Sequence, residues 1–286
     1  MLRSRHITTP PPAVASPLRL CAVLLIAVAL AVQACSKPFQ PRKFPTTMDL
    51  YRASVQEYQK HHWDNALAGF DLLAQQLPAR DTLLADVYWY QGQTHERRDE
   101  HLLAAQAYSR IIDAFPDDSI ADDALLRTGS EYEAMWRKPM LDAQYGQTAL
   151  ATYRQLLSLY PDSKLVPEAG KRIASLNGRF AQKDFDTGDY YYRRKAWDSA
   201  IIYFRDVTRM YPGTPSARLS YLRLLSAFRA INYKEDVTET CAEARKFYPS
   251  DDEITRACAS VPNALATDTA RAATDSTRPR APIPPR

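Results

Sequence analysis

The chain has few glycines, only eight in 286 residues, and this scarcity excludes several kinds of site. A phosphate-cradling loop needs clustered glycines, because its backbone amides must approach the phosphate closely. No such cluster is present, and no serine stands in the sequence context of a hydrolase nucleophile. We therefore assign no catalytic residue, and we expect neither an enzymatic activity nor a cofactor.

Histidine is also scarce, with five in the whole chain. His61, His62, His95 and His101 are close in sequence, but no two of them share a helical face with a carboxylate in the spacing of a metalloprotease. The short runs of aspartate and serine that follow several prolines are typical of helix N-caps. The sequence therefore predicts no metal site.

Long apolar runs are missing too, since the longest, Leu20–Val32, has thirteen residues. A membrane span needs about twenty, whereas a run of this length after arginines is typical of a signal peptide. Its end, Val32-Gln33-Ala34-Cys35, resembles a bacterial lipobox. We expect residues 1–34 to be a lipoprotein signal peptide and Cys35 to be the acylated N-terminus. The alternative is ordinary cleavage that leaves Cys35 as a free thiol.

No excess of either charge remains once residues 1–34 are removed, because 34 basic residues then face 33 acidic ones. We therefore expect no nucleic-acid partner. Residues 35–47 hold three prolines and no periodicity, which predicts a flexible lipidated tether. Residues 262–286 are rich in Ala, Thr, Pro and Arg, which predicts a disordered tail. Between them, residues 48–261 are enough to bury one continuous core.

What the chain does contain is a repeated spacing: a small residue, an aromatic four positions later and a proline eight positions after that. The small residue and the aromatic share a helical face, and the proline ends the helix. A period of this size indicates a stacked array of helix pairs. The copies are Ala66…Phe70…Pro78, Ala104…Tyr108…Pro116, Ala149…Tyr153…Pro161 and Ala200…Phe204…Pro212, with a fifth, Val237…Cys241…Pro249, that lacks the aromatic.

Glycine marks the partner helix in two copies, since Gly92 and Gly188 each precede the small residue by twelve positions. Glycine at a helix crossing lets two backbones approach closely, which offsets its low helix propensity. The arrangement resembles the tetratricopeptide repeat. The predicted fold is all-α: a right-handed superhelical solenoid of about five tetratricopeptide-like helix pairs, with disordered ends. Arrays of this kind bind other proteins.

The middle of the chain departs from this period in two places. Ala149 comes about eight residues late relative to Gly129, which predicts an insertion over residues 136–146. The helix that contains Gly188 has room to begin near Val166, so we expect it to be extended.

Cysteine is scarce as well, and Cys241 and Cys258 are the only ones after Cys35. The turn at residues 248–251 lies midway between them, so an antiparallel helix pair would bring the two cysteines to matching heights. An oxidising compartment would then join them. We predict a disulfide; the alternative is two buried free thiols.

One stretch is more specific than the repeat itself. It includes Asp142-Ala-Gln144, Tyr160-Pro-Asp-Ser163, Arg179-x-Ala181, Tyr190-Tyr191, Arg194 and Ala196-Trp197, in that order. These residues, together with Cys35 ahead of the repeats, resemble the BamD (ComL-like) family of outer-membrane assembly lipoproteins. Ile202-Tyr203 stands where some members carry an Asn-Arg pair, so an ionic contact is not expected there.

The resemblance implies a scaffold of the β-barrel assembly machinery that is lipid-anchored at the periplasmic face of the outer membrane. Its C-terminal repeats would dock on a BamA-type barrel protein, with Arg179, Tyr191, Arg194 and Trp197 at that surface. Its N-terminal repeats would receive unfolded outer-membrane proteins. The alternative for Tyr191 and Trp197 is that they only hold helices together.

On the repeat template, five side chains face the concave side of repeats one and two: Tyr51, Tyr58, Trp89, Gln93 and Arg97. We expect them to form a groove for the substrate peptide, because aromatic side chains offer a large and pre-ordered contact area. Tyrosines at helical spacing are also common in cores, and this alternative applies to the two tyrosines. For the whole chain, the alternative function is a periplasmic repeat adaptor that coordinates envelope constriction or peptidoglycan synthesis.

Overall fold

The computed structural model describes residues 38–139 and 142–261, and over these ranges every regular element is a helix. The predicted signal peptide, Cys35 and the whole predicted C-terminal tail lie outside the described residues. The elements are η1 (Pro41–Lys43), α2 (Thr47–Gln59), α3 (Trp63–Gln76), α4 (Leu83–Arg97), α5 (His101–Ala114), α6 (Ala121–Met135), α7 (Gln144–Leu159), α8 (Val166–Arg193), α9 (Trp197–Met210), α10 (Pro215–Ala230), α11 (Lys234–Phe247) and α12 (Asp252–Ala257).

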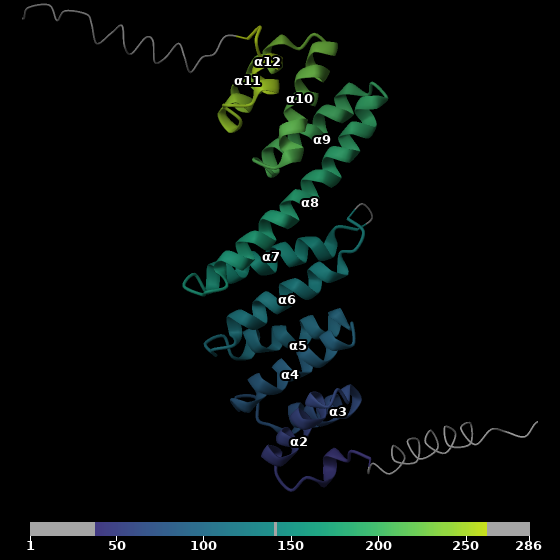
Figure 1. Cartoon of the computed structure of the whole chain (residues 1–286), viewed down its shortest axis with the longest axis vertical. Helices are drawn as coiled ribbons and strands as arrows, with labels where there is room; N and C mark the ends of the chain where they lie inside the picture. Colours follow the sequence, from purple (N-terminus) through teal and green to yellow (C-terminus); the bar gives the residue numbers. More distant parts are fainter. Residues whose placement is uncertain (1–37, 140–141, 262–286) are drawn as a thin grey trace, which may run out of the picture.

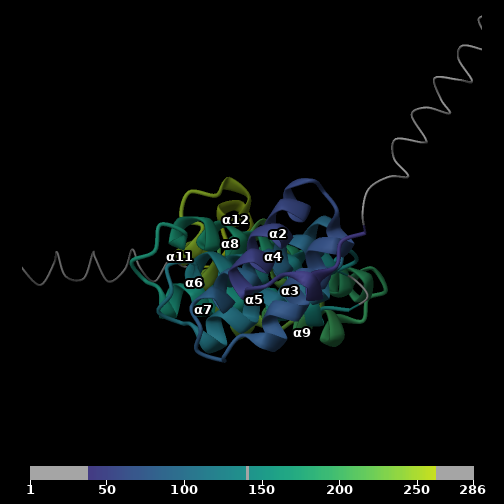
Figure 2. The same cartoon turned by 90° about the horizontal axis from the view of Figure 1, so that it is seen from below.

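Within the described residues the α-helices form five antiparallel pairs, and one short helix follows the last pair. The pairs, which we number as repeats one to five, are α2/α3, α4/α5, α6/α7, α8/α9 and α10/α11. Each helix packs mainly on its neighbours in the chain, so the pairs stack along one axis (Figure 1). Figure 2 looks along that axis from the α2 end and shows successive pairs rotated relative to one another. The predicted all-α repeat solenoid is confirmed, while its handedness stays a prediction.

The repeated spacing forms the core of each pair. Ala104 and Tyr108 are fully buried on α5, and Tyr108 lies against Gly92 of α4. A Cβ atom at Gly92 would come within 2.5 Å of the Tyr108 ring, and one at Gly129 equally close to the Tyr153 ring. Glycine is therefore required at these crossings, because any side chain would displace the aromatic ring that fills the pair.

The middle of the chain is irregular in the way that the spacing predicts. The segment between α6 and α7 separates the helices of repeat three, although α7 already begins two residues before Gly146. The extended helix α8 has 28 residues. Its first part, up to Phe180, is buried with repeat three, and the part from Ala181 onward is buried with repeats four and five. This one helix therefore joins the two halves of the solenoid.

Part of the predicted tether is packed on repeat one. The rings of Phe39 and Phe44 lie 5.7 Å apart and contact the core around Leu50 and Phe70. The flexible tether expected over residues 35–47 is therefore too long. Burial of the two phenylalanine side chains is favourable in free energy, so this part of the segment packs on repeat one.

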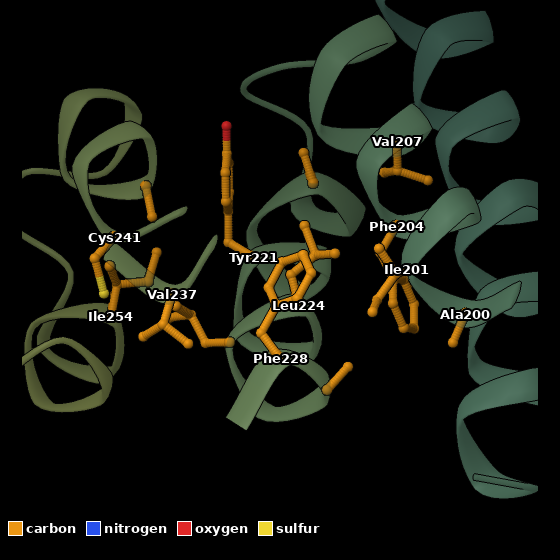
Figure 3. Packing of buried hydrophobic residues seen from close by; sticks show 14 of the residues in the cluster. Ala200, Ile201, Phe204, Val207, Tyr221, Leu224, Phe228, Val237, Cys241 and Ile254 are labelled. Carbon is orange, nitrogen blue, oxygen red and sulfur yellow. The ribbon is translucent and has the colours of Figure 1, made fainter. Parts of the chain in front are cut away.

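The C-terminal end is closed by α12. Phe204 of α9 faces Phe228 of α10, and on the other side of α10 lie Val237, Cys241 and Ile254 (Figure 3). Cys241 and Cys258 form a disulfide with a Cα–Cα distance of 5.7 Å, and both side chains are fully buried. The α12 helix thus covers the apolar face that α10 and α11 would otherwise expose. Within the described ranges, no helix is long and apolar enough to cross a membrane.

Candidate protein-docking surfaces

Tyr51 and Tyr58, which we predicted to line a groove, lie within an aromatic cluster of repeats one and two. Their rings lie 6.2 Å and 5.3 Å from the ring of Tyr90, which stacks on Phe70. Burial raises the pKa of Tyr51 to about 12, so its phenol stays protonated at neutral pH. Both tyrosines are half-buried, and their main role in this structure is to hold α2 against α4.

The other three predicted groove residues follow one another along α4. Trp89, Gln93 and Arg97 are spaced by four residues, so they lie on one side of the helix. Trp89 is half-buried, with its ring centroid 5.3 Å from that of Tyr108, whereas Arg97 is exposed. The exposed part of this stripe is free to contact a ligand, and Trp89 is held in place by the core beneath it.

Two hydrogen bonds to Glu96 link repeats two and three beside this stripe. Tyr108 donates a hydrogen bond to Glu96 Oε2 at 2.9 Å, and Arg127 of α6 donates to Glu96 Oε1 at 2.9 Å. Burial and the Glu96 carboxylate raise the pKa of Tyr108 far above its usual range, so it is always a donor here. The glutamate therefore couples the core of one repeat to the first helix of the next.

The same arrangement recurs one repeat later. Tyr153 donates to Glu133 at 3.0 Å, and Arg172 of α8 lies 3.5 Å from the same oxygen. Neither glutamate was predicted from the sequence, although both carry a signal: Glu96 and Glu133 each stand four residues after a repeat glycine. One helical turn from the crossing is where a carboxylate meets the tyrosine hydroxyl.

Arg179, which we predicted at a partner surface, contacts the insertion. Its guanidinium lies 4.2 Å from the ring centroid of Trp136 and donates to the Trp136 carbonyl oxygen. Trp136 is only 2% exposed and packs on Phe180, which lies on α8 next to Arg179, with ring centroids 4.3 Å apart. Arg179 therefore holds the start of the insertion against α8.

Five side chains from the end of α8 and the first half of α9 make up a surface that we call the C-terminal patch: the exposed Tyr190, Arg194 and Ile202 and the half-buried Tyr191 and Tyr203. Arg194 lies 3.5 Å from the ring centroid of Tyr190, and Tyr191 stacks on Tyr203 at 5.6 Å. Ile202 is 61% exposed. Two of the predicted docking residues, Tyr191 and Arg194, therefore lie together, beside three residues that the prediction left out.

Trp197, the fourth predicted docking residue, packs behind this patch. Its ring lies 5.2 Å from that of Tyr192, and the Tyr192 hydroxyl is 2.7 Å from Ser226 Oγ on α10. Arg223 of α10 lies over the Tyr192 ring. Trp197 thus stabilises the joint between repeats four and five, in agreement with the alternative that it holds helices together.

The histidines are engaged with carboxylates at the turns. His95 Nδ1 lies 2.7 Å from Glu100, and His101 Nδ1 lies 2.7 Å from Glu131 of the next repeat. Burial raises the pKa of Glu131, which is only 4% exposed. Among the residues that the structure describes, no three potential metal ligands come together.

Comparison with known proteins identifies the family. A family model described as "Outer membrane lipoprotein" (YfiO) matches residues 45–243. The chain belongs to this family. It is 25% identical over 230 residues to the "Outer membrane protein assembly factor BamD" of Vibrio cholerae, which covers 76% of this chain and 93% of that protein. A protein of the same name from Xylella fastidiosa is 24% identical over 221 residues, covering 70% and 72% of the two chains.

The predicted resemblance to the BamD family is thereby confirmed. Among solved structures, a tetratricopeptide-repeat protein from Bacteroides fragilis aligns with a TM-score of 0.45 at 12% identity, covering 80% of this chain and all of that one. The tetratricopeptide domain of P58(IPK) aligns with a TM-score of 0.39 at 12% identity, covering 74% and 54% of the two chains.

Proposed function

We propose that this lipoprotein is a non-catalytic scaffold of the outer-membrane β-barrel assembly machinery. Relatives named as outer membrane protein assembly factors support a role in outer-membrane protein assembly. The repeat architecture supports a binding role. The observation that carries the proposal is the C-terminal patch, in which an exposed tyrosine, arginine and isoleucine lie with two half-buried tyrosines within the region that the family model matches. Aromatic residues and arginine are the side chains enriched at the energetic centres of protein interfaces.

The C-terminal patch is the proposed docking site for a BamA-type barrel protein. Tyr190 is 47% exposed and Arg194 is held over its ring, so both present a fixed surface before any partner arrives. Ordering costs on binding are small for side chains that are already fixed. Ile202, on the next helix, adds an apolar centre to this surface.

The stripe along α4 is the proposed contact for unfolded outer-membrane proteins. Trp89 rests on Tyr108 and is therefore pre-ordered, while Gln93 and Arg97 next to it offer hydrogen bonds and a positive charge. Tyr51 and Tyr58 contact Tyr90, which neighbours Trp89 in the chain, and so hold α2 against α4. An extended peptide with an aromatic end fits a surface of this composition.

The lipid anchor is proposed at Cys35, which would fix the scaffold to the periplasmic face of the outer membrane. The first described residue, Pro38, is three positions further along the chain, and Phe39 is already packed on repeat one. Repeat one would therefore lie close to the membrane. Intact-mass analysis of the membrane-extracted protein tests this: it should begin at Cys35 and carry added lipid mass, and Cys35→Ser should lack that mass.

Docking is tested by co-purification from detergent-solubilised envelopes with a matched pair of variants on α9. Ile202→Glu puts a charge into the C-terminal patch, whereas Met210→Glu puts the same charge at a side chain that is 60% exposed outside it. We expect Ile202→Glu to lose the BamA-type protein and Met210→Glu to keep it, with both variants folded by circular dichroism. Retention of the partner by Ile202→Glu would refute the docking site. Capture of peptidoglycan-synthesis proteins instead would favour the adaptor function.

A further inference from the structure

A second surface, at the opposite edge of the solenoid, has a different character. Two cavities of about 460 and 500 Å³ lie at the turns that connect successive repeats. One lies between the α5–α6 and α7–α8 turns, which are on the same edge in Figure 1. The other lies between the α3–α4 and α5–α6 turns, and the two cavities share Asp118 and Ser119. The two cavities therefore adjoin each other along one edge of repeats one to three, and we call them together the edge groove.

The edge groove is negatively charged throughout. Its lining includes six carboxylates and neither a lysine nor an arginine; the carboxylates are Asp81, Asp86, Asp117, Asp118, Asp122 and Asp162. None of the six forms an ion pair with the described residues. Burial, and to a smaller degree the charge of Asp118, raise the pKa of Asp86. Arg80 and Lys164 belong to the same turns but line neither cavity.

The groove is also apolar along its floor and rim. Leu159 is 51% exposed and Met48 is 42% exposed, and both line it. Pro116 and Pro161 also line the first cavity, whose turns are joined by a hydrogen bond from the Tyr160 hydroxyl to the Pro116 carbonyl oxygen. A ligand that suits this surface carries positive charge and apolar groups in alternation.

The chain itself contains such a segment. Its last nine residues read Arg278-Pro-Arg-Ala-Pro-Ile-Pro-Pro-Arg286, with three arginines, four prolines, one isoleucine and no acidic residue. Arginine forms bidentate bonds with carboxylates, and a proline-rich segment is extended without needing backbone partners. We propose that residues 278–286 occupy the edge groove of the same molecule, with the arginines on its carboxylates and the prolines and Ile283 against Leu159.

The connection is long enough for this contact. Arg278 is 17 residues beyond Val261, the last described residue, and Arg286 is 25 beyond it. At about 3.3 Å per residue for a fully extended chain, these residues can reach at most roughly 56 and 83 Å. Repeat three is two repeats away, and at about 10 Å per packed helix the distance is roughly 40 Å. The tail can therefore span repeats four and five and lie across the turns of repeat three.

Photo-crosslinking in the full mature chain tests the proposal. The photoreactive residue p-benzoylphenylalanine replaces Leu159 in the groove, and in a matched control it replaces Leu103, which is 46% exposed at the start of α5. We expect illumination to join position 159 to residues 278–286 within the monomer, as mapped by mass spectrometry, and position 103 to give no such product. The yield should fall as salt rises from about 0.05 M to about 0.5 M, because exposed charges are then screened.

Charge reversal adds the second arm. Asp117→Lys and Asp162→Lys change two carboxylates that make no hydrogen bond in the structure, and together they should lower the crosslinking yield about tenfold. Glu235→Lys and Glu239→Lys, on exposed positions of α11, should leave the yield unchanged. Products found only in crosslinked dimers, equal products from positions 103 and 159, or no product to residues 278–286 would each overturn the proposal. None of these outcomes depends on the docking site proposed above.

Discussion

The guanidinium of Arg179 lies 4.2 Å from the ring centroid of Trp136, and it also donates a hydrogen bond to the Trp136 carbonyl oxygen. The two residues are 43 positions apart and connect the start of the insertion to the middle of α8. Gly146 of α7 leaves the space for the indole ring, since a Cβ there would come within 2.4 Å of it. The start of the insertion is therefore packed into repeat three.

Removal of this contact is expected to destabilise the protein. Arg179→Ala loses a cation–π contact and a hydrogen bond from a charged donor, which together contribute about 2 kcal/mol to the free energy of unfolding. Urea denaturation followed by circular dichroism measures it. Arg137→Ala, at an exposed neighbouring position, should change the stability by less than about 0.5 kcal/mol. Equal effects of the two substitutions would show that the contact is not a stabilising one.

The same substitution, glycine to alanine, should change the stability in opposite directions at two positions. Gly92→Ala places a Cβ 2.5 Å from the Tyr108 ring and should cost about 1–3 kcal/mol through overpacking. Gly170→Ala, in α8, meets nothing within 4 Å and should raise the stability by up to about 1 kcal/mol through helix propensity. Thermal melts of the two variants should therefore shift in opposite directions. A stabilised Gly92→Ala would contradict the close packing described for repeat two.

The repeat register was predictable from sequence because it rests on short-range rules. Ala104 and Tyr108 share a helical face by spacing alone, and Pro116 ends the helix by its own covalent geometry. The burial of Trp136 was not predictable in this way. It depends on a glycine in the next helix and on an arginine 43 positions away, and no local pattern connects these residues.

The candidate surfaces show the same limit. Spacing placed Tyr51 and Tyr58 on one side of α2, but which side faces solvent depends on how α4 crosses it, and Tyr90 covers that side. Tyr191 and Arg194 were correctly placed near each other because they share one helix end. Ile202 was missed as part of their surface, since its exposure follows from the packing of α9 on α8.

The end of the solenoid should respond to acid through Asp251. This carboxylate caps α12 and accepts hydrogen bonds from Arg218 of α10, which lower its pKa to about 2. Because its pKa in the unfolded chain is near 3.9, the stabilisation is complete above about pH 5 and is lost as the pH falls from about 4 to about 2. Arg218→Gln should therefore be less stable than the natural protein at pH 7 and approach it at pH 2.

Arg209→Gln is the control for that measurement. Arg209 pairs with Asp206 one turn away on the surface of α9, where the Arg side chain is 76% exposed. An exposed pair of this kind contributes little, so the stability of Arg209→Gln should follow the natural protein at every pH. A difference for Arg218→Gln that stays constant from pH 7 to pH 2 would show that Asp251 does not carry the effect.

The disulfide between Cys241 and Cys258 should determine how far the C-terminal end stays folded. It closes a separation of 17 residues, and a loop of this size contributes about 3 kcal/mol to the free energy of unfolding. In a solenoid each repeat is stabilised only by its neighbours, so the loss on reduction should stay local. Hydrogen exchange should accelerate in α11 and α12 after reduction and remain unchanged in α4 and α5. Alkylation of both thiols in unreduced, denatured protein would exclude the bond, and acceleration throughout the chain would exclude the local effect.

Arg245 donates to the carbonyl oxygens of Cys258 and Val261, so some order at this end should survive reduction and depend on that arginine. Arg245→Ala combined with reduction should therefore release α12 more completely than either change alone.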